Sequence, residues 1–203
     1  MKVLAFGAHP DDIEIGCGGT LALHAARGDE VHLFIATRGE AGGDAETRSR
    51  EAEQAARILG ARAIHWGGCE DTRLPEQFLQ LLQAIEQVVR EVEPELVYVN
   101  HGEDTHQDHR ALAQAVIAAT RYVPTVLSYE TPTTYGFEPV VFSCISDTLS
   151  HKLRALEAHA SQVERTHLAI NIVQVALAAA HFRGVQSRLS CAEGFVPVRM
   201  RWL

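Results

Sequence analysis

Two short stretches of this chain hold most of the side chains that could bind a metal or move a proton. The first, residues 7–20, contains His9, Asp11 and Asp12 directly after the apolar run at residues 3–6. Imidazole and carboxylate groups at the end of a buried strand must find water, a partner or a metal, because leaving them unpaired is costly. Packing alone does not explain these residues.

The second stretch follows another apolar run, at residues 96–99, and is denser in such groups. Its side chains of this kind are His101, Glu103, Asp104, His106, Asp108 and His109. The carboxyl ends of parallel strands meet at one edge of a sheet, so the two stretches are expected to be neighbours in space. Together they predict one divalent metal site.

Three of these residues could hold the metal. Catalytic zinc usually has three protein ligands and one position left for water. His9 and Asp12 lie on one tight turn, and His109 could complete a His/Asp/His set. A His-Pro-Asp-Asp turn on its own could merely cap a helix. The second stretch also follows a predicted strand of the same sheet, and this favours the metal site over a simple helix cap.

The remaining groups suit acid–base chemistry. Asp11 is adjacent to a candidate ligand and could take a proton from metal-bound water. His106 and Asp108 resemble an imidazole oriented by a carboxylate, an arrangement that favours the charged ring. An imidazolium there could stabilise an oxyanion or protonate a leaving amine. We expect Asp104 to brace its loop rather than to contact the metal.

The elements that must position these residues alternate along the chain. Apolar runs predict strands over residues 3–6, 31–36, 62–66 and 96–99. Helical spacing of apolar residues predicts helices over residues 16–27, 46–59, 75–92 and 110–122. Such alternation predicts right-handed βαβ units. The expected fold class is α/β, with a Rossmann-like, mostly parallel sheet flanked by helices.

The pattern changes after residue 123. Strands are predicted over residues 126–130 and 140–145, and helices over residues 147–161 and 168–183. No repeat or linker separates this part from the rest. We therefore expect one domain over residues 1–203, with a Rossmann-like core over 1–123. A small α+β extension would cover residues 124–203.

Composition limits the classes of partner. The net charge is −8, from 18 basic and 26 acidic residues, and no Lys/Arg-rich stretch suggests nucleic-acid binding. No apolar run is long enough for a bilayer, and none at the N-terminus predicts a signal peptide. The four cysteines form no CxxC pair, which fits a reducing cytoplasm. We expect a cytoplasmic protein that acts on a small molecule.

Both stretches carry recognisable motifs. The first reads Ala8-His9-Pro10-Asp11-Asp12, followed by Glu14, Gly16 and Gly18-Gly19-Thr20; the second is Asp104-Thr105-His106-Gln107-Asp108-His109. They resemble the motifs of the PIG-L/LmbE-type zinc-dependent N-acetylglucosamine deacetylases, which usually have Pro in place of Gln107. The resemblance continues through Arg48, Glu51, Ala55, Leu59-Gly60, Asp147, His159-Ala160-Ser161-Gln162 and Ala192-Glu193-Gly194-Phe195.

The resemblance implies a role for each matching residue. His9, Asp12 and His109 would hold Zn²⁺, or another divalent metal such as Fe²⁺. Asp11 would be the general base, and His106, backed by Asp108, would stabilise the oxyanion or act as general acid. Arg48 matches a family arginine on the substrate side, where it could bind sugar hydroxyls or an anionic aglycone, and residues 124–203 would complete the substrate pocket. On spacing alone, Arg48 could equally be a surface charge near Glu46 and Glu51.

The implied reaction is hydrolysis of the acetamide of an amino sugar, with an N-acetylglucosamine-containing small molecule as substrate. The family includes deacetylases of thiol-cofactor precursors, antibiotic sugars, nucleotide sugars and chitooligosaccharides, and a bacillithiol-type precursor is one candidate. Selectivity is expected in the loops at residues 38–47, 68–75 and 130–139. The resemblance also implies a homo-oligomer.

Three alternatives differ in chemistry. A metal-dependent amidase could act on a non-sugar acetamide. A nucleotide-binding oxidoreductase is suggested by Gly16-Cys17-Gly18-Gly19 after a strand. Carboxylates on the preceding turn would repel a pyrophosphate, and the spacing from Gly7 does not fit G-x-G-x-x-G. A metal-binding protein without turnover would need neither Asp11 nor His106.

Overall fold

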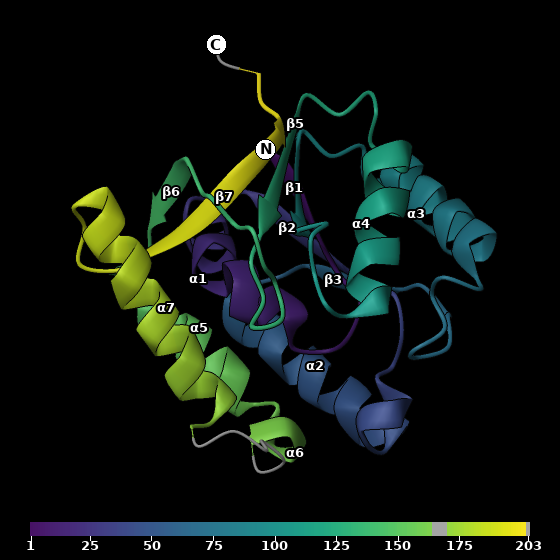
Figure 1. Cartoon of the computed structure of the whole chain (residues 1–203), viewed down its shortest axis with the longest axis horizontal. Coiled ribbons are helices and arrows are strands. Elements are labelled where there is room, and N and C mark those ends of the chain that lie inside the picture. The colour runs from purple at the N-terminus through teal and green to yellow at the C-terminus, as the bar shows by residue number, and fades with distance from the viewer. Residues whose placement is uncertain (164–169, 202–203) are drawn as a thin grey trace.

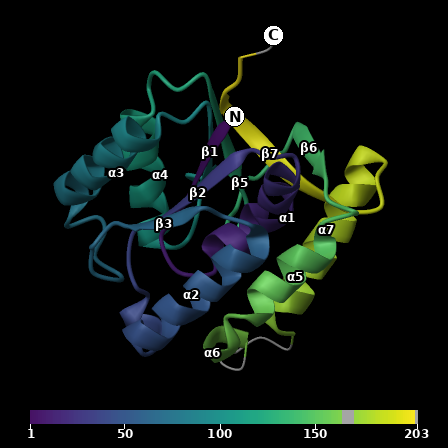
Figure 2. The same cartoon turned by 180° about the vertical axis from the view of Figure 1, so that it is seen from behind.

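A computed structural model describes residues 1–163 and 170–201. Within them, one seven-stranded sheet lies between two layers of helices (Figure 1, and from behind in Figure 2). The strands are β1 (Lys2–Gly7), β2 (Glu30–Ile35), β3 (Ala63–Trp66), β4 (Leu96–Asn100), β5 (Thr125–Tyr129), β6 (Val141–Cys144) and β7 (Ala192–Arg199). The helices are α1 (Asp12–Ala26), α2 (Ala45–Leu59), α3 (Phe78–Val92), α4 (Gln107–Ala119), α5 (Leu149–Glu157), α6 (Ala160–Val163) and α7 (Ile172–Ser187), with a 3₁₀ turn η1 (Glu40–Gly42).

The strand order confirms the predicted fold class. It runs β3-β2-β1-β4-β5-β7-β6, and β1 to β5 pair in parallel. Only β7 is antiparallel, to both β5 and β6. The chain order reverses between β1 and β4, so the carboxyl ends of these two strands border the switch-point crevice.

The two faces of the sheet are covered by different helices. Helices α3 and α4 cover one face, while α1, α2, α5 and α7 lie on the other side (Figures 1 and 2). Helix α3 packs through Leu81, Ile85, Val88 and Val92, whose spacing forms one stripe along the helix. Helix α1 packs against the opposite face of the sheet through Ile13, Cys17 and Leu21. The sheet is therefore held from both sides, and its carboxyl edge is a rigid base for a site.

Several helix bounds differ from those predicted. Helix α1 begins at Asp12 instead of residue 16, and α4 begins at Gln107 instead of residue 110. Asp12, Asp108 and His109 therefore occupy first helical turns, where patterns of apolar residues give no signal. Helix α3 starts at Phe78, after turns at residues 75–77. Helix α7 runs over 172–187, and the predicted start at 168 lies outside the described residues.

Close packing at Gly16 ties β5 to the start of α1. A Cβ at Gly16 would lie 1.9 Å from Cδ2 of Tyr129, so any larger residue would push this ring away. The Tyr129 hydroxyl donates to the backbone oxygen of Phe6 at 2.6 Å. One glycine thus lets a β5 side chain cross beneath the turn that carries the first motif.

Two further findings bear on the predictions about membrane spans and cysteines. In the part of the chain that the structure describes, no helix has both the length and the apolar character needed to cross a bilayer. All four cysteines lie in that part, and they are free thiols.

Candidate metal and catalytic site

The turn between β1 and α1 is built around the Asp12 carboxylate. Its Oδ2 accepts hydrogen bonds from the backbone N–H groups of Ala8 and His9, at 3.0 and 2.8 Å. Asp11, just before the helix, has φ 104° and makes no side-chain capping bond. This left-handed conformation is unusual for a residue other than glycine, although Asp and Asn tolerate it best. The turn therefore fixes Asp12 and leaves the Asp11 carboxylate uncommitted to the backbone.

His109, in the first turn of α4, is held in a single orientation. Its Nδ1 lies 3.0 Å from Asp104 Oδ2, and its Nε2 lies 3.3 Å from Asp12 Oδ1. Asp104 is fully buried and also accepts bonds from the Thr131 hydroxyl and the His106 backbone N–H. Asp104 thus braces its loop, as predicted, and in addition orients His109.

His9 faces three carboxylates. Its Nδ1 lies 3.4 Å from Asp12 Oδ2, and its Nε2 lies 3.0 Å from Asp71 Oδ1 and 3.2 Å from Asp108 Oδ2. Asp71 belongs to the loop after β3 and was not among the predicted site residues. The only sequence signal for Asp71 is its position in a loop at the same edge of the sheet. Glu70 lies in the same loop, so this signal does not single out Asp71.

The predicted pairing of Asp108 with His106 is wrong for the side chains. The Asp108 carboxylate points to His9 and accepts backbone N–H groups of Thr72 and Leu74, at 2.7 and 3.2 Å. Only the Asp108 backbone N–H reaches His106, where it donates to Nδ1 at 3.2 Å. Satisfying two loop N–H groups in the interior outweighs a contact with one ring.

The residues fit a divalent cation. Ligand atoms of His9, Asp12 and His109 all lie within 4.8 Å of one another, and all three residues are buried. If His9 Nδ1 and His109 Nε2 face the cation with Asp12, the other ring nitrogens donate to the carboxylates of Asp108, Asp71 and Asp104. Histidines that bind metals are commonly oriented by carboxylates in this way. His9, His106 and Asp108 also converge. That set is less suitable because backbone N–H groups already occupy Asp108 and His106 Nδ1.

The pKa shifts of His9, Asp12 and His109 also favour a bound cation. Burial lowers the pKa of His109, but the carboxylates of Asp12 and Asp104 outweigh it and raise the pKa to about 9. Burial also lowers the pKa of His9, and its carboxylate partners again raise it well above its ordinary value. For Asp12, burial raises the pKa, but the two histidines hold it well below its usual range. A cation among these groups would replace the imidazole protons.

Asp11 has the environment of a general base. Burial and the charge on Asp12 raise its pKa to about 6, although Arg48 acts in the opposite direction. Arg48 is 4% exposed and donates to the backbone oxygens of Pro10 and Gly39, each at 2.8 Å. Its Nη2 lies 3.5 Å from Asp11 Oδ2. Arg48 is therefore not a surface charge, and it supports the turn that presents Asp11.

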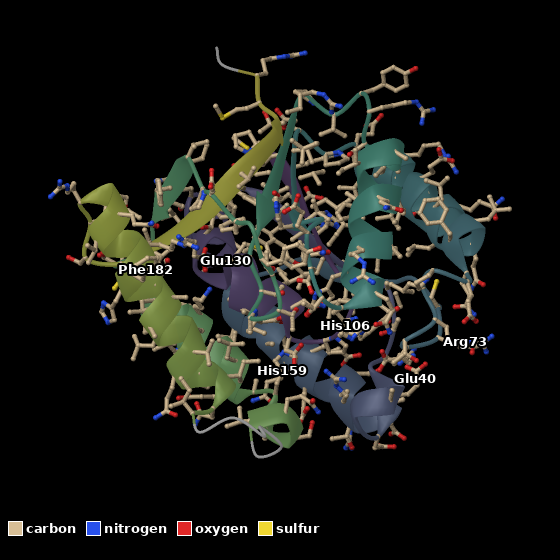
Figure 3. The ribbon with its side chains drawn as sticks, in the orientation of Figure 1. Glu40, Arg73, His106, Glu130, His159 and Phe182 are labelled. Carbon is tan, nitrogen blue, oxygen red and sulfur yellow. The ribbon has the colours of Figure 1, made fainter. Side chains whose placement is uncertain are left out.

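His106 stands at the N-terminal end of α4 (labelled in Figure 3). In the neutral ring, Nδ1 accepts the Asp108 backbone N–H, so the proton belongs on Nε2. Burial and the nearby His9 and His109 lower its pKa. The ring centres of His9 and His109 lie 4.7 and 4.8 Å away. The lowered pKa favours a neutral ring with Nε2–H as a hydrogen-bond donor over the predicted imidazolium.

A hollow of about 320 Å³ lies over these groups. All three loops expected to govern selectivity line it; their lining residues are Ala41, Gly42, Asp71, Thr72, Thr131, Pro132 and Thr133. Ile172 of α7 also lines it, which the sequence patterns did not indicate. The arrangement provides a cation site, a carboxylate beside it and a neutral N–H donor, all open to one hollow.

The chain belongs to the PIG-L family. Residues 4–120 match the family described as PIG-L, GlcNAc-PI de-N-acetylase. An uncharacterised deacetylase, YaiS of Escherichia coli K12, is 39% identical over 167 residues, which cover 78% of this chain and 90% of that protein. A probable N-acetyl-α-D-glucosaminyl L-malate deacetylase of Bacillus cereus is 30% identical over 189 residues, covering 80% of this chain and 84% of the other.

Solved structures share the fold over nearly the whole chain. N,N'-diacetylchitobiose deacetylase from Pyrococcus horikoshii has a TM-score of 0.83 at 25% identity, covering 97% of this chain and 83% of the other. The 4-carboxy-2-hydroxymuconate hydratase GalB of Pseudomonas putida has the same TM-score at 24% identity, covering 100% and 98%. Because the second similarity shows the fold alone, the reaction must be argued from the site.

Proposed function

We propose that this protein is a metal-dependent hydrolase that removes the N-acetyl group from an N-acetylglucosamine-containing small molecule. One observation carries the proposal. The buried ligand atoms of His9, Asp12 and His109 converge within 4.8 Å, and the uncommitted Asp11 carboxylate stands beside them in the same hollow. The names of the PIG-L relatives support the reaction class, and the residue types at the site suit amide hydrolysis without an organic cofactor.

The chain's own residues supply the metal-binding and proton-transfer groups. His9, Asp12 and His109 would hold the cation, for which Zn²⁺ is the first candidate and Fe²⁺ the second. A cation bound there lowers the pKa of a water molecule and polarises an amide carbonyl. Asp11 accepts the proton of the attacking water. His106 donates its Nε2–H to the oxygen that becomes negative as the water adds to the carbonyl carbon.

The second half of the reaction breaks the C–N bond. The proton that Asp11 has accepted passes to the sugar nitrogen, which leaves as a neutral amine while the carbonyl carbon leaves as acetic acid. Arg48 acts as a positioning residue, because its guanidinium donates to the carbonyls of Pro10 and Gly39 and lies 3.5 Å from the Asp11 carboxylate. Asp108 and Asp71 hold His9 by the ring nitrogen that faces away from Asp12.

Acetate release tests the proposal directly. The protein is assayed against a panel of N-acetylglucosamine compounds, with a non-sugar acetamide as the comparison, after chelation and after addition of Zn²⁺ or Fe²⁺. We expect release that chelation abolishes and one metal restores. Release from the non-sugar acetamide alone would favour a general amidase. Metal binding without release from any compound would overturn the proposed reaction and leave a metal-binding protein.

Three finer points remain predictions. The panel includes a bacillithiol-type precursor, N-acetylglucosaminyl L-malate, whose candidacy is supported by the name of the Bacillus cereus relative. Gel filtration coupled to light scattering tests the expected homo-oligomer. The free thiols fit a reducing cytoplasm, which localisation of the tagged protein in its own cell would test.

A further inference from the structure

The short helix α6 is tied to the wall of the hollow over the metal site. It lies beside α5 and α2 in both views (Figures 1 and 2). Gln162 of α6 donates from Nε2 to the backbone oxygen of Gly42 at 3.4 Å. Gly42 belongs to η1 and lines the hollow. A contact of α6 therefore reaches the surface that faces a substrate.

Gly42 also packs against Arg48. A Cβ on Gly42 would lie 2.6 Å from Arg48 Nη1 and 3.6 Å from Gln162 Oε1, so a larger residue would displace the guanidinium. The backbone of this wall thus fits between a guanidinium and an amide. Arg48 Nη2 in turn lies 3.5 Å from Asp11 Oδ2. A shift of α6 would act on the wall directly, and on the proposed base only through Arg48.

Two polar contacts hold the start of α6 in place. Ser161 donates from its backbone N–H and its hydroxyl to the two oxygens of Glu51, at 2.9 and 2.6 Å. His159, in the connection between α5 and α6, has its Nε2 3.4 Å from Glu14 Oε1. Because Glu51 belongs to α2 and Glu14 to the first turn of α1, α6 is tied to both of these helices.

The pair of Glu14 and His159 is completely buried. Glu14 is 1% exposed and His159 is 0% exposed. In the part of the chain that the structure describes, no other group forms a hydrogen bond with either side chain. Burial lowers the pKa of His159, but the carboxylates of Glu14, Asp11 and Glu51 outweigh it and raise the pKa. The two side chains therefore form an ion pair, and separating them would leave charges unpaired in the interior.

The place of this pair in the fold connects the two sides of the hollow. Glu14 lies three residues after Asp11, within the same helical turn as the first motif. His159 begins the segment whose Gln162 reaches the wall at Gly42. A buried ion pair adds little net stability over apolar residues of the same size, and its best-attested use is to fix the register of two elements. Here the two elements are the turn that carries the first motif and the helix behind the wall.

We propose that Glu14 and His159 are positioning residues for the hydrolytic reaction. Their buried pair holds α6 in register with the first motif, so that Gln162 fixes Gly42 where the wall meets the bound amino sugar. This inference rests on the proposed function. Because neither residue lines the hollow, binding of the substrate depends on the pair, whereas metal binding and the chemical step do not.

A kinetic test uses Glu14→Gln, His159→Gln and the double variant, with N-acetylglucosamine as substrate. Each single variant leaves one buried charge without its partner. It should raise KM by about tenfold and keep kcat within about twofold, because small displacements of a binding wall are costly. Metal content should not change.

The double variant leaves no charge and places two amides opposite each other, so KM should return most of the way to the wild-type value. A purely structural role would lower the amount of active, metal-loaded protein without changing KM. An unchanged KM in both single variants, or a double variant no better than the worse single variant, overturns the proposal.

Gln162→Ala tests the same link and leaves the buried pair intact. It removes the contact with Gly42, so KM should again rise with kcat and metal content unchanged. Gln54→Ala makes the same change at an exposed position of α2 and is the matched control. If the two variants have equal KM values, Gln162 does not transmit the position of α6 to the wall and the proposal is wrong.

Amide hydrogen exchange tests the positioning without any substrate. Exchange is followed in the Zn²⁺-loaded protein for a peptide covering residues 39–44, with α3, on the other face of the sheet, as the reference (Figure 1). We expect this peptide to exchange at least about threefold faster in Glu14→Gln and in Gln162→Ala, because a loosened wall opens more often, while α3 is unchanged.

The exchange result separates the two proposals. If no compound releases acetate but the peptide exchanges faster in both variants, the proposed function fails and the link from the buried pair to the wall stands. Unchanged exchange of the peptide overturns the inference, whatever the activity. Equally faster exchange in α3 would also overturn it, because the variants would then have loosened the whole fold.

Discussion

Two clusters of buried charged residues lie close to the start of α1, and they differ in how their charges are balanced. In the metal cluster, defined by His9, Asp12 and His109, carboxylates outnumber the permanent cations around them. In the Lys152–Glu193 pair, one cation meets one carboxylate at 2.6 Å, and backbone groups of α1 satisfy both. The first arrangement calls for a bound cation, and the second is complete without one.

The comparison shows that burial of charge does not by itself indicate function. Both clusters are almost inaccessible to solvent, and each borders a hollow. The metal cluster meets its hollow beside Asp11 and His106, whereas Lys152 and Glu193 meet theirs with their charges already paired. The Lys152–Glu193 pair joins α5, β7 and the middle of α1. Substitutions should therefore affect metal content and turnover at one cluster and folding stability at the other.

The largest effect is expected for His109→Ala. Losing one of three protein ligands should bring metal content after gel filtration to background and reduce acetate release by at least about 10³-fold. His101→Ala, in the same connection between β4 and α4 but outside the lining of the hollow, is the control. A variant that keeps one metal ion per chain as tightly as the wild type would contradict the ligand assignment.

Asp11→Asn should separate turnover from metal binding. Asparagine tolerates the left-handed backbone at this position, so the turn should persist. Removing a general base typically lowers turnover by about 10²–10⁴-fold, and we expect that loss with metal content unchanged. Elemental analysis and initial rates on the same preparation provide the check. Loss of the metal together with turnover would identify Asp11 as a ligand instead.

Lys152→Met should act on stability rather than on the metal. It leaves Glu193 buried without its cation, and breaking such a pair costs about 3–5 kcal/mol of unfolding free energy. The double variant Lys152→Met/Glu193→Gln should recover part of this loss because no charge remains unpaired. Urea unfolding measures the stabilities, and metal titration of the folded protein should match the wild type. A large loss of metal affinity in the folded variant would mean that the two clusters are not separate.

The smallest effects are expected from the carboxylates behind the metal cluster. Asp104→Asn weakens the acceptor for His109 Nδ1 and should reduce metal affinity by about 10–100-fold. Asp71→Asn should have a smaller effect, because Asp108 also accepts from His9 Nε2. Competition with a chelator of known affinity ranks the two. The reverse order would show that His9, rather than His109, depends more on its outer carboxylate.

Residues close together in the sequence were the predictable part of the site. His9, Asp11 and Asp12 share one turn, and β1 and β4 deliver both motifs to one sheet edge as a parallel topology requires. Arg48 could not be placed from its spacing, because only the tertiary fold brings the Gly39 and Pro10 carbonyls to its guanidinium. Asp71 was missed for the same reason.

Long-range contacts were the unpredictable part. The partner of Asp108 depends on the path of the loop after β3, whose N–H groups at Thr72 and Leu74 claim its carboxylate. The antiparallel placement of β7 between β5 and β6 follows from no local pattern. The sequence predicted the helix that contains α7, but not that its residues Val175, Ala176, Ala179 and Ala180 line a hollow beside the metal cluster.

The Glu193 carboxylate links the end of the chain to its first helix. It accepts the backbone N–H groups of Gly19 and Thr20, in the middle of α1, while Lys152 donates to the Ile15 carbonyl of the same helix. During synthesis α1 leaves the ribosome long before β7 exists. Until residue 193 arrives, Lys152 and these backbone groups of α1 lack the carboxylate that joins them, so the helix that begins at the first motif gains these contacts only when β7 docks.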